Sequence, residues 1–521
     1  MVFKKIEKHK TFVVGRQVLD ILTSGMYDNP LMVYREYIQN SADSIDKADR
    51  EGVFLRKDGQ IRITIDGLNR SISIFDNGLG VSNNEVEKVL LSIGCSSKES
   101  TSGRGFRGIG RLGGLAYCRK LRFETRSNLA EQIAIVEWDQ GQLSSLLTGD
   151  HLKTLDEAID LLTSVSFRKA GNDEPEHFFK VTLEGVERFY TDQLMDVGAV
   201  KKYLSQVAPV SYDRAAFSFA QSIEAFFSDV EGVDVYDISL NGERIYRPYA
   251  DDFEITKERS EKISGIEFFH FKSTSGEPIA KGWFAKTSFK SSFPPSCLAR
   301  GMRVRQGNIE VGDEYFLSQF YAERRFATWQ IGEVQICGNV LKTNARRDGF
   351  EHTSNYQVFL ERAGLLGSHL SKLCREASRE RCSRQLVEVL MSEVKDLVDG
   401  SSIFINEEHF KAAVSLAGKK LQKLNSFFDG RIDCDELATK YHVLLDKFEA
   451  MADNGQLLSD KINGQVLNGK KAKKVIEEII GSIKKHYGKA GNADELINHV
   501  LARYLKDSDA KMSIANIAID V

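Results

Sequence analysis

The sequence SISIFDNGLG at residues 71–80 is the first of three informative segments in the N-terminal part of the chain. Its first five residues alternate polar and apolar side chains, as a half-buried strand does. Asp76 follows the strand, and Gly78 and Gly80 come next, so a fixed carboxylate lies beside backbone that a flat ligand can approach closely. Such a carboxylate accepts a hydrogen bond from an exocyclic amine such as that of adenine. An ordinary turn after a strand is the alternative interpretation.

A helix is predicted upstream, at residues 31–48. It follows the Asn-Pro pair at residues 29–30, which suits the N-cap and the first helical position. At about 100° per residue, Asn40 lies about 40° from Glu36 and Asp43 about 20° on the other side, so the three share one face. Two acids and a carboxamide on one face suit a magnesium ion beside a water molecule that loses a proton. A solvated polar stripe is the alternative.

A third segment, GRGFRGIGRLGG at residues 103–114, contains six glycines in twelve residues. Glycine costs backbone entropy, so this run is typical of a mobile loop whose N–H groups wrap phosphates and lead into a helix N-terminus. Three arginines add positive charge. No Gly-Lys-Ser/Thr closes the loop, which excludes a Walker A motif. No strand runs straight into it, which excludes the dinucleotide fingerprint. A flexible surface loop is the alternative.

The order and spacing of these segments resemble the Bergerat ATP-binding fold of the GHKL superfamily. The shared pattern is Glu-x3-Asn-x2-Asp on a helix, Asp-x-Gly-x-Gly after a strand, and then a Gly-rich lid. The superfamily includes the ninety-kilodalton heat-shock chaperones, gyrase B subunits, MutL and MORC proteins, and histidine kinases. Residues 10–350 resemble the chaperone-like branch, whereas the lid sequence GFRG at residues 105–108 is similar to that of MutL.

The resemblance implies a role for each matching residue. Glu36 would polarise the attacking water as general base, Asn40 would hold magnesium, and Asp43 would support that site. Asp76 would bind the adenine amine. The other nucleotide-binding candidates are positions near the base or in the lid: Gly78, Gly80, Lys98, Gly105, Gly108, Ile109 and Gly110. Lys98 could contact a phosphate, and an exposed lysine of the lid without such a contact is an equally good interpretation.

The sequence departs from two family patterns. Chaperone-type members carry a Gly-Thr pair before a late strand, but here Thr182 has no glycine before it, so that contact is unassigned. Histidine kinases place a phospho-accepting histidine on an upstream dimerisation helix. Only His9 precedes Glu36 in this sequence, and no such helix surrounds it, so that branch is excluded.

The segment from 201 to 355 has mainly strand-like patterns, including an Asn-Gly hairpin turn at residues 241–242. The sequence LKTNARRD at residues 341–348 resembles the chaperone loop that places a cation on the γ-phosphate. Arg347 fits this register best and Arg346 is the alternative, while an Arg–Asp surface network would explain the same residues. Three further arginines, Arg300, Arg303 and Arg305, are expected to face water rather than line a groove for an anionic partner.

Helical spacing dominates after about residue 355. Two apolar stripes step by three and four residues: Leu366, Leu370, Leu373 and Ala377, then Leu386, Leu390, Val394 and Leu397. Lysine clusters at 470–474 and 484–489 are interpreted as solvated helix faces rather than as a nucleic-acid site. The resemblance implies that the chain dimerises through its end.

Composition limits the class of protein. The 521 residues are too many for one core, and we expect an α+β protein with an α/β sandwich ATPase domain (1–200), an α/β transducer domain (201–355) and a helical region (356–521). Lys and Arg number 71 against 74 Asp and Glu, so the chain does not bind nucleic acid over its whole surface. Seven cysteines without a CxxC pair, no long apolar run and no signal peptide predict a cytoplasmic protein.

The patterns and the resemblance together imply a homodimeric clamp that binds and hydrolyses ATP with Mg2+ and remodels protein clients. A nucleic-acid-associated ATPase of the MORC or MutL kind, as part of a bacterial anti-phage defence system, is the alternative. The lid arginines and the lysine clusters favour that alternative, and the near-neutral charge favours the first. No endonuclease signature is found, so DNA cutting is not predicted.

Overall fold

The structure, a computed structural model, describes residues 29–92, 110–141, 155–188, 191–289, 291–344, 347–399, 407–428 and 435–453. The chain divides into two compact units, Met1–Ala377 and Ser378–Val521. The combination of largely antiparallel β-sheets with helices confirms the α+β class. No helix in the described parts of the chain combines the length and the apolar character that crossing a bilayer requires.

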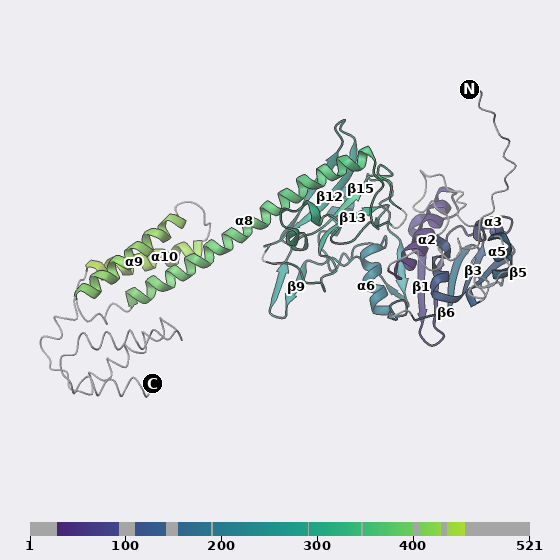
Figure 1. The fold of residues 1–521 in the computed structure, drawn as a ribbon, viewed down its shortest axis with the longest axis horizontal. Helices are drawn as coiled ribbons and strands as arrows, with labels where there is room; N and C mark the ends of the chain where they lie inside the picture. Colours follow the sequence, from purple (N-terminus) through teal and green to yellow (C-terminus); the bar gives the residue numbers. More distant parts are fainter. Residues whose placement is uncertain are drawn as a thin grey trace, which may run out of the picture. The chain divides into compact units, whose positions relative to one another are not determined.

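The first sheet has eight strands in the order β5-β4-β3-β6-β2-β1-β7-β8. Figure 1 labels four of them, β1, β6, β3 and β5. Its neighbours are antiparallel except β1 and β7, which pair in parallel. The strands are β1 (Gln60–Asp66), β2 (Ser71–Asp76), β3 (Cys118–Arg126), β4 (Gln132–Asp139), β5 (Thr163–Lys169), β6 (Phe178–Val186), β7 (Asp237–Leu240) and β8 (Glu243–Arg244). The accompanying helices are α2 (Met32–Arg50), η1 (Arg56–Asp58), α3 (Val86–Leu90), η2 (Gly110–Tyr117), α5 (Leu155–Leu162) and α6 (Val197–Val207).

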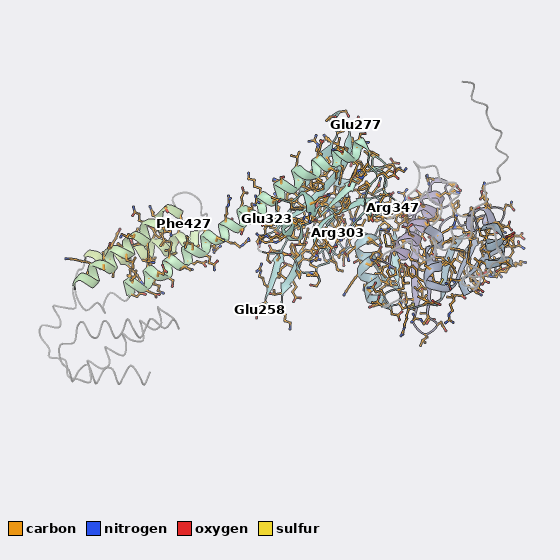
Figure 2. All side chains as sticks on the ribbon, viewed as in Figure 1. Glu258, Glu277, Arg303, Glu323, Arg347 and Phe427 are labelled. Carbon is orange, nitrogen blue, oxygen red and sulfur yellow. The ribbon has the colours of Figure 1, made fainter. Side chains whose placement is uncertain are left out.

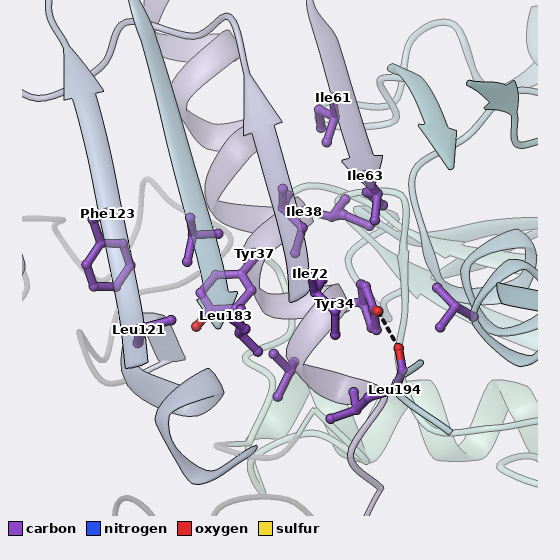
Figure 3. Close-up of a cluster of buried hydrophobic side chains, with 14 of the residues drawn as sticks. Tyr34, Tyr37, Ile38, Ile61, Ile63, Ile72, Leu121, Phe123, Leu183 and Leu194 are labelled. Atoms are coloured by element: carbon purple, nitrogen blue, oxygen red, sulfur yellow. Dashed lines mark hydrogen bonds between the residues drawn. The ribbon is translucent and has the colours of Figure 1, made fainter. Parts of the chain in front are cut away.

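Helix α2 packs one apolar face against this sheet. The predicted N-cap is wrong, because the helix begins at Met32 with Leu31 as its N-cap and without a side-chain cap. Asn29 lies two residues earlier, where its Oδ1 accepts a hydrogen bond from the Leu31 amide at 3.0 Å. Tyr34 and Ile38 then belong to the same buried core as the strand residue Ile72 (Figure 3). The opposite, half-buried face of α2 is therefore free to carry the polar residues of a site.

The hairpin predicted at Asn241 and Gly242 is confirmed, because both residues have positive φ, +48° and +85°, between β7 and β8. These two strands complete the first sheet, and its core continues to Ile245. Strands of the first sheet thus lie on both sides of the domain boundary that we predict near residue 200.

The second sheet has five strands in the order β11-β12-β15-β13-β14. Its strands are β11 (Gly265–Lys272), β12 (Pro278–Lys286), β13 (Gly301–Gln306), β14 (Ile309–Glu310) and β15 (Ile331–Ile336). The remaining elements of this region are α7 (Ala220–Phe227), η3 (Ser318–Phe320), η4 (Arg324–Trp329) and the hairpin of β9 (Asp252–Thr256) and β10 (Arg259–Lys262). Separate apolar cores fill the space around this sheet.

The prediction that the arginines of β13 face water is wrong. Every residue of β13 is buried, and Arg303 and Arg305 are 4% and 1% exposed. The strand lies between β14 and β15, so its side chains meet protein rather than solvent. Buried carboxylates compensate the charges, because Arg303 bonds Glu310 and Arg305 bonds Glu333, each at 2.7 Å.

Helix α8 (Ser354–Asp399) contributes to a core in each unit. Leu366 and Leu370 of the first predicted apolar stripe are buried in the core of the second sheet. In the second unit α8 packs with α9 (Glu407–Phe428) and α10 (Asp435–Asp453) through a core that includes Val387. The second predicted stripe is wrong at its start, because Leu386 is 38% exposed while its neighbour Val387 is fully buried.

Candidate functional site

Asp76 is a buried carboxyl group at the end of β2. It is 1% exposed, and its Oδ1 accepts a hydrogen bond from the Gly78 amide at 3.0 Å. Ser41 and Ser44 of α2 also bond to it. Burial raises the pKa of Asp76 to about 7, and these three hydrogen bonds offset only part of that effect. A buried carboxyl with hydroxyl and amide neighbours is suited to receive a further donor from a ligand.

The two glycines after Asp76 are required by close packing. A Cβ atom at Gly78 would lie 2.2 Å from Ser44 Oγ and 2.7 Å from Asp76 Oδ1. Gly80 has φ +70°, and a Cβ atom there would lie 2.1 Å from the carbonyl oxygen of Arg126. The glycines therefore let α2 and β3 approach the turn, in addition to the approach of a flat ligand that the sequence predicts.

Glu36, Asn40 and Asp43 lie half-buried on α2, on the face that their spacing predicts. The Glu36 side chain is 17% exposed, and its Oε1 lies 3.5 Å from Nη2 of Arg35. A Cβ atom at Gly110 would lie 2.6 Å from Glu36 Oε2, so the end of the Gly-rich segment touches this carboxylate. Of the other lid candidates, Lys98, Gly105, Gly108 and Ile109 lie outside the described residues.

One helix joins the two groups of predicted site residues. Ser44, which bonds Asp76, lies eight residues after Glu36, so about 12 Å of helix axis separates them. Asn40 lies between them along the axis. The arrangement can accommodate an elongated ligand with its amine at Asp76 and its reacting end at Glu36.

Tyr37 is a site residue that sequence reasoning missed. Its hydroxyl donates to the carbonyl of Arg111 at 3.0 Å and accepts from the Gly114 amide at 3.1 Å. A Cβ atom at Gly114 would lie 2.4 Å from this hydroxyl. Tyr37 therefore fixes the described end of the Gly-rich segment to α2. An aromatic residue directly after the predicted base is only a weak sequence signal for this contact.

The sequence leaves the Gly-Thr contact unassigned, and the structure shows which threonine lies on the Asp76 side of the sheet. Thr182 pairs with Ser73, so it faces the opposite side of the sheet from Asp76, whose partner in β6 is Phe179. Thr125 of β3 is fully buried on the Asp76 side of the sheet. Its Oγ1 accepts from the Val81 amide at 2.8 Å and donates to the Phe178 carbonyl at 3.0 Å, which braces the glycine turn.

Arg347 occupies a tight turn of the second-sheet region (Figure 2). Its φ is +56°, its amide donates to the Asn344 carbonyl at 3.2 Å, and its carbonyl accepts from Gly312 at 3.1 Å. Arg347 is 9% exposed. The alternative residue, Arg346, lies outside the described residues, and the γ-phosphate role of either arginine stays a prediction.

The residues of α2 fit a magnesium ion. Asn40 and Asp43 offer oxygen ligands on one face of the helix, about one and about two helical turns from Glu36. Within the described parts of the chain, no three His, Cys, Asp or Glu side chains gather as a metal cluster. Magnesium usually keeps several waters and binds through one or two protein oxygens plus the phosphates of its substrate.

Comparison with known proteins supports this interpretation. Residues 30–171 match the family model described as histidine kinase-, DNA gyrase B-, and HSP90-like ATPase. The chaperone protein HtpG of Alkaliphilus metalliredigens is 33% identical over 110 residues, which are 19% of this chain and 18% of that protein. HtpG of Rhodococcus jostii is 28% identical over 176 residues, 33% of this chain and 23% of that protein.

The chain thus spans about a fifth of the length of the curated relatives it matches. The matched family segment contains α2, the glycine turn after β2 and the Gly-rich segment. Residues 30–171 therefore belong to the GHKL superfamily of ATPase domains, close to its Hsp90-like branch.

Proposed function

We propose that this protein is an ATP-hydrolysing conformational clamp that remodels protein clients. The observation that carries the proposal is the single helix α2, which holds the Asp76 carboxyl through Ser41 and Ser44 and presents Glu36 and Asn40 further along. The similarity to the chaperone protein HtpG supports the choice of protein clients.

In this mechanism the two groups of site residues along α2 have different tasks. Asp76 accepts the adenine amine, and the glycine turn admits the flat base beside it. Glu36 takes the proton from the attacking water, in an orientation that the neighbouring Arg35 helps to hold. Asn40, supported by Asp43, would hold the magnesium ion, which neutralises charge on the phosphates.

The Gly-rich segment would close over the phosphates. Tyr37 anchors its described end, and Gly110 lies against Glu36, so closure brings backbone N–H groups to the reacting end of the ligand. Arg347 would then approach the γ-phosphate and stabilise the charge that develops there. Opening and closing of a homodimer would follow from tighter binding of ATP to one global state.

The nucleic-acid-associated alternative depends on the lid arginines and on the lysine clusters. Arg111, one of the three lid arginines, donates from Nη2 to the Ser92 carbonyl at 2.6 Å, so it has a structural task in the described structure. The lysine clusters lie outside the described residues. If duplex DNA raises the rate of ATP hydrolysis at low salt, and this increase disappears as the salt concentration rises, the result would favour the alternative.

The test compares the wild-type protein with Glu36→Ala. We expect the wild type to bind ATP and release phosphate in the presence of magnesium. The variant should bind ATP with similar affinity but release phosphate at least about 10²-fold more slowly, because the base is needed only in the chemical step. Isothermal titration gives the affinity and a phosphate-release assay gives the rate. A wild-type protein that binds no ATP would refute the proposal.

A further inference from the structure

Helix α6 connects the ATPase domain to the second sheet. It contacts α2 on one side and β14 on another. Val200 and Leu204 fix it in the core of the first sheet, where both are fully buried. Any movement of the second sheet that shifts α6 therefore acts on α2, the helix that carries Glu36.

Gln206, in the last turn of α6, is held by two buried arginines. Arg303 Nη2 donates to Gln206 Oε1 at 2.9 Å, and Arg305 Nη2 donates to the Gln206 carbonyl. Cations at a helix C-terminus satisfy carbonyls that have no partner within the helix and interact favourably with its dipole. The Gln206 Nε2 donates to the Lys202 carbonyl at 3.0 Å, which turns the Oε1 atom toward Arg303.

Tyr203 lies three residues before Gln206, on the same face of α6. The charged groups that act on its hydroxyl are Arg35, Glu310 and Glu36. Glu310 is also the ion-pair partner of Arg303, at 2.7 Å. α6 therefore contacts α2 with Tyr203 in electrostatic range of the Arg35–Glu36 pair, and one turn later Gln206 bonds the buried arginines of the second sheet.

We propose that Tyr203 and Gln206 are positioning residues for Glu36, through which the second sheet controls ATP hydrolysis. The inference rests on the proposed function of Glu36 as the general base. The hydrogen bond between Gln206 and Arg303 holds α6 in one orientation against α2, with the Tyr203 hydroxyl in electrostatic range of Arg35 and Glu36. A base that is displaced by a fraction of an ångström loses much of its catalytic effect, so a small shift of α6 changes the rate of hydrolysis.

The test uses Gln206→Ala, which removes one of several acceptors around Arg303 and leaves its ion pair with Glu310. We expect kcat for ATP hydrolysis to fall about 3- to 10-fold with KM and ATP affinity unchanged, because only the orientation of the base is altered. Gln206→Glu retains an acceptor for Arg303 and should restore most of the rate. Gln221→Ala, on the exposed surface of α7, is the matched control.

Tyr203→Phe gives an independent measurement, because it keeps the ring packing and removes only the hydroxyl near Arg35 and Glu36. It should also lower kcat without changing ATP affinity. Unchanged kcat in both Gln206→Ala and Tyr203→Phe would overturn the inference, as would a Gln206→Glu variant as slow as Gln206→Ala. A wild-type protein that does not hydrolyse ATP would instead refute the proposed function, so the two failures are distinguishable.

Discussion

Replacing Asp76 with asparagine is expected to stabilise the nucleotide-free protein at alkaline pH while abolishing ATP binding. Burial raises the pKa of this carboxyl from 3.8 to about 7 in the folded protein. The folded state therefore holds the proton more tightly than the unfolded state. The resulting stability is complete below pH 3.8 and is lost progressively as pH rises to about 7. Asparagine has no such titration.

The magnitude follows from the size of the shift. A difference of about three pKa units is worth about 4 kcal/mol well above pH 7, at about 1.4 kcal/mol per unit. At pH 5 the wild-type protein has lost only about 1.6 kcal/mol of this stability, because pH 5 is just over one unit above the pKa of the carboxyl in the unfolded state. The advantage of Asp76→Asn over wild type should therefore grow by about 2 to 3 kcal/mol between pH 5 and pH 8.5.

The side chain of asparagine can keep the local contacts. Its oxygen can accept from the Gly78 amide, and its amide group can donate to the hydroxyl of Ser41 or Ser44. Nucleotide binding should nevertheless be lost, because the adenine amine no longer meets a charged acceptor and the new amide group presents donors of its own.

Hydrogen exchange of peptides from α2 at pH 5 and pH 8.5, corrected for intrinsic rates, reports the local free energy of opening. Isothermal titration reports ATP binding. Asp173→Asn, at an exposed position, is the matched control and should change neither quantity. An equal pH dependence in wild type and Asp76→Asn would refute the reasoning, since it would mean that this carboxyl does not titrate near pH 7.

Three other substitutions test separate parts of the site. Arg347→Ala should lower turnover about 10²-fold or more by removing charge stabilisation in the transition state; Arg346→Ala is its control, and the reverse result in the phosphate-release assay would move the role to Arg346. Tyr37→Phe leaves the Arg111 carbonyl and the Gly114 amide without the hydroxyl, so a loss of about 1–3 kcal/mol in thermal unfolding and weaker ATP binding are expected. Tyr34→Phe is the control, because the Tyr34 hydroxyl donates to the Leu194 carbonyl instead, and this variant should lose stability without losing ATP affinity. Identical ATP affinities in the two variants would contradict the anchoring role of Tyr37. Thr125→Val should cost about 1–3 kcal/mol in urea unfolding because the Val81 amide loses its acceptor, whereas Thr125→Ser should retain most of the stability; equal losses would show that the hydroxyl is not the cause.

Local patterns were sufficient where one element determines the geometry. Helical spacing alone places Glu36, Asn40 and Asp43 on one face, and alternation alone gives the strand that ends at Asp76. The Asn-Gly turn between β7 and β8 depends only on two adjacent residues. These features are independent of how distant parts of the chain come together.

The sequence was not sufficient where the partner lies far along the chain. Ser41 and Ser44 became site residues only because α2 packs over the end of β2, which no spacing on α2 indicates. Arg305 looks like a surface residue until Glu333, 28 positions away, is placed beside it on a neighbouring strand. Val387 is buried instead of the predicted Leu386, and this difference likewise depends on which side of α8 meets α9 and α10.

Asp76 and Glu333 show how burial distinguishes a ligand site from a structural ion pair. Both carboxyls are almost completely buried, and burial acts to raise both pKa values. At Glu333, however, Arg247 and Arg305 outweigh burial, so the pKa falls below its ordinary value and the charge is retained. Asp76 is bonded by two hydroxyls and one backbone amide, which are too weak to lower its pKa to the ordinary value. A donor from outside the chain can supply the missing stabilisation. For that reason we propose that the uncompensated carboxyl of Asp76, rather than the more strongly paired carboxyl of Glu333, accepts the adenine amine of the nucleotide.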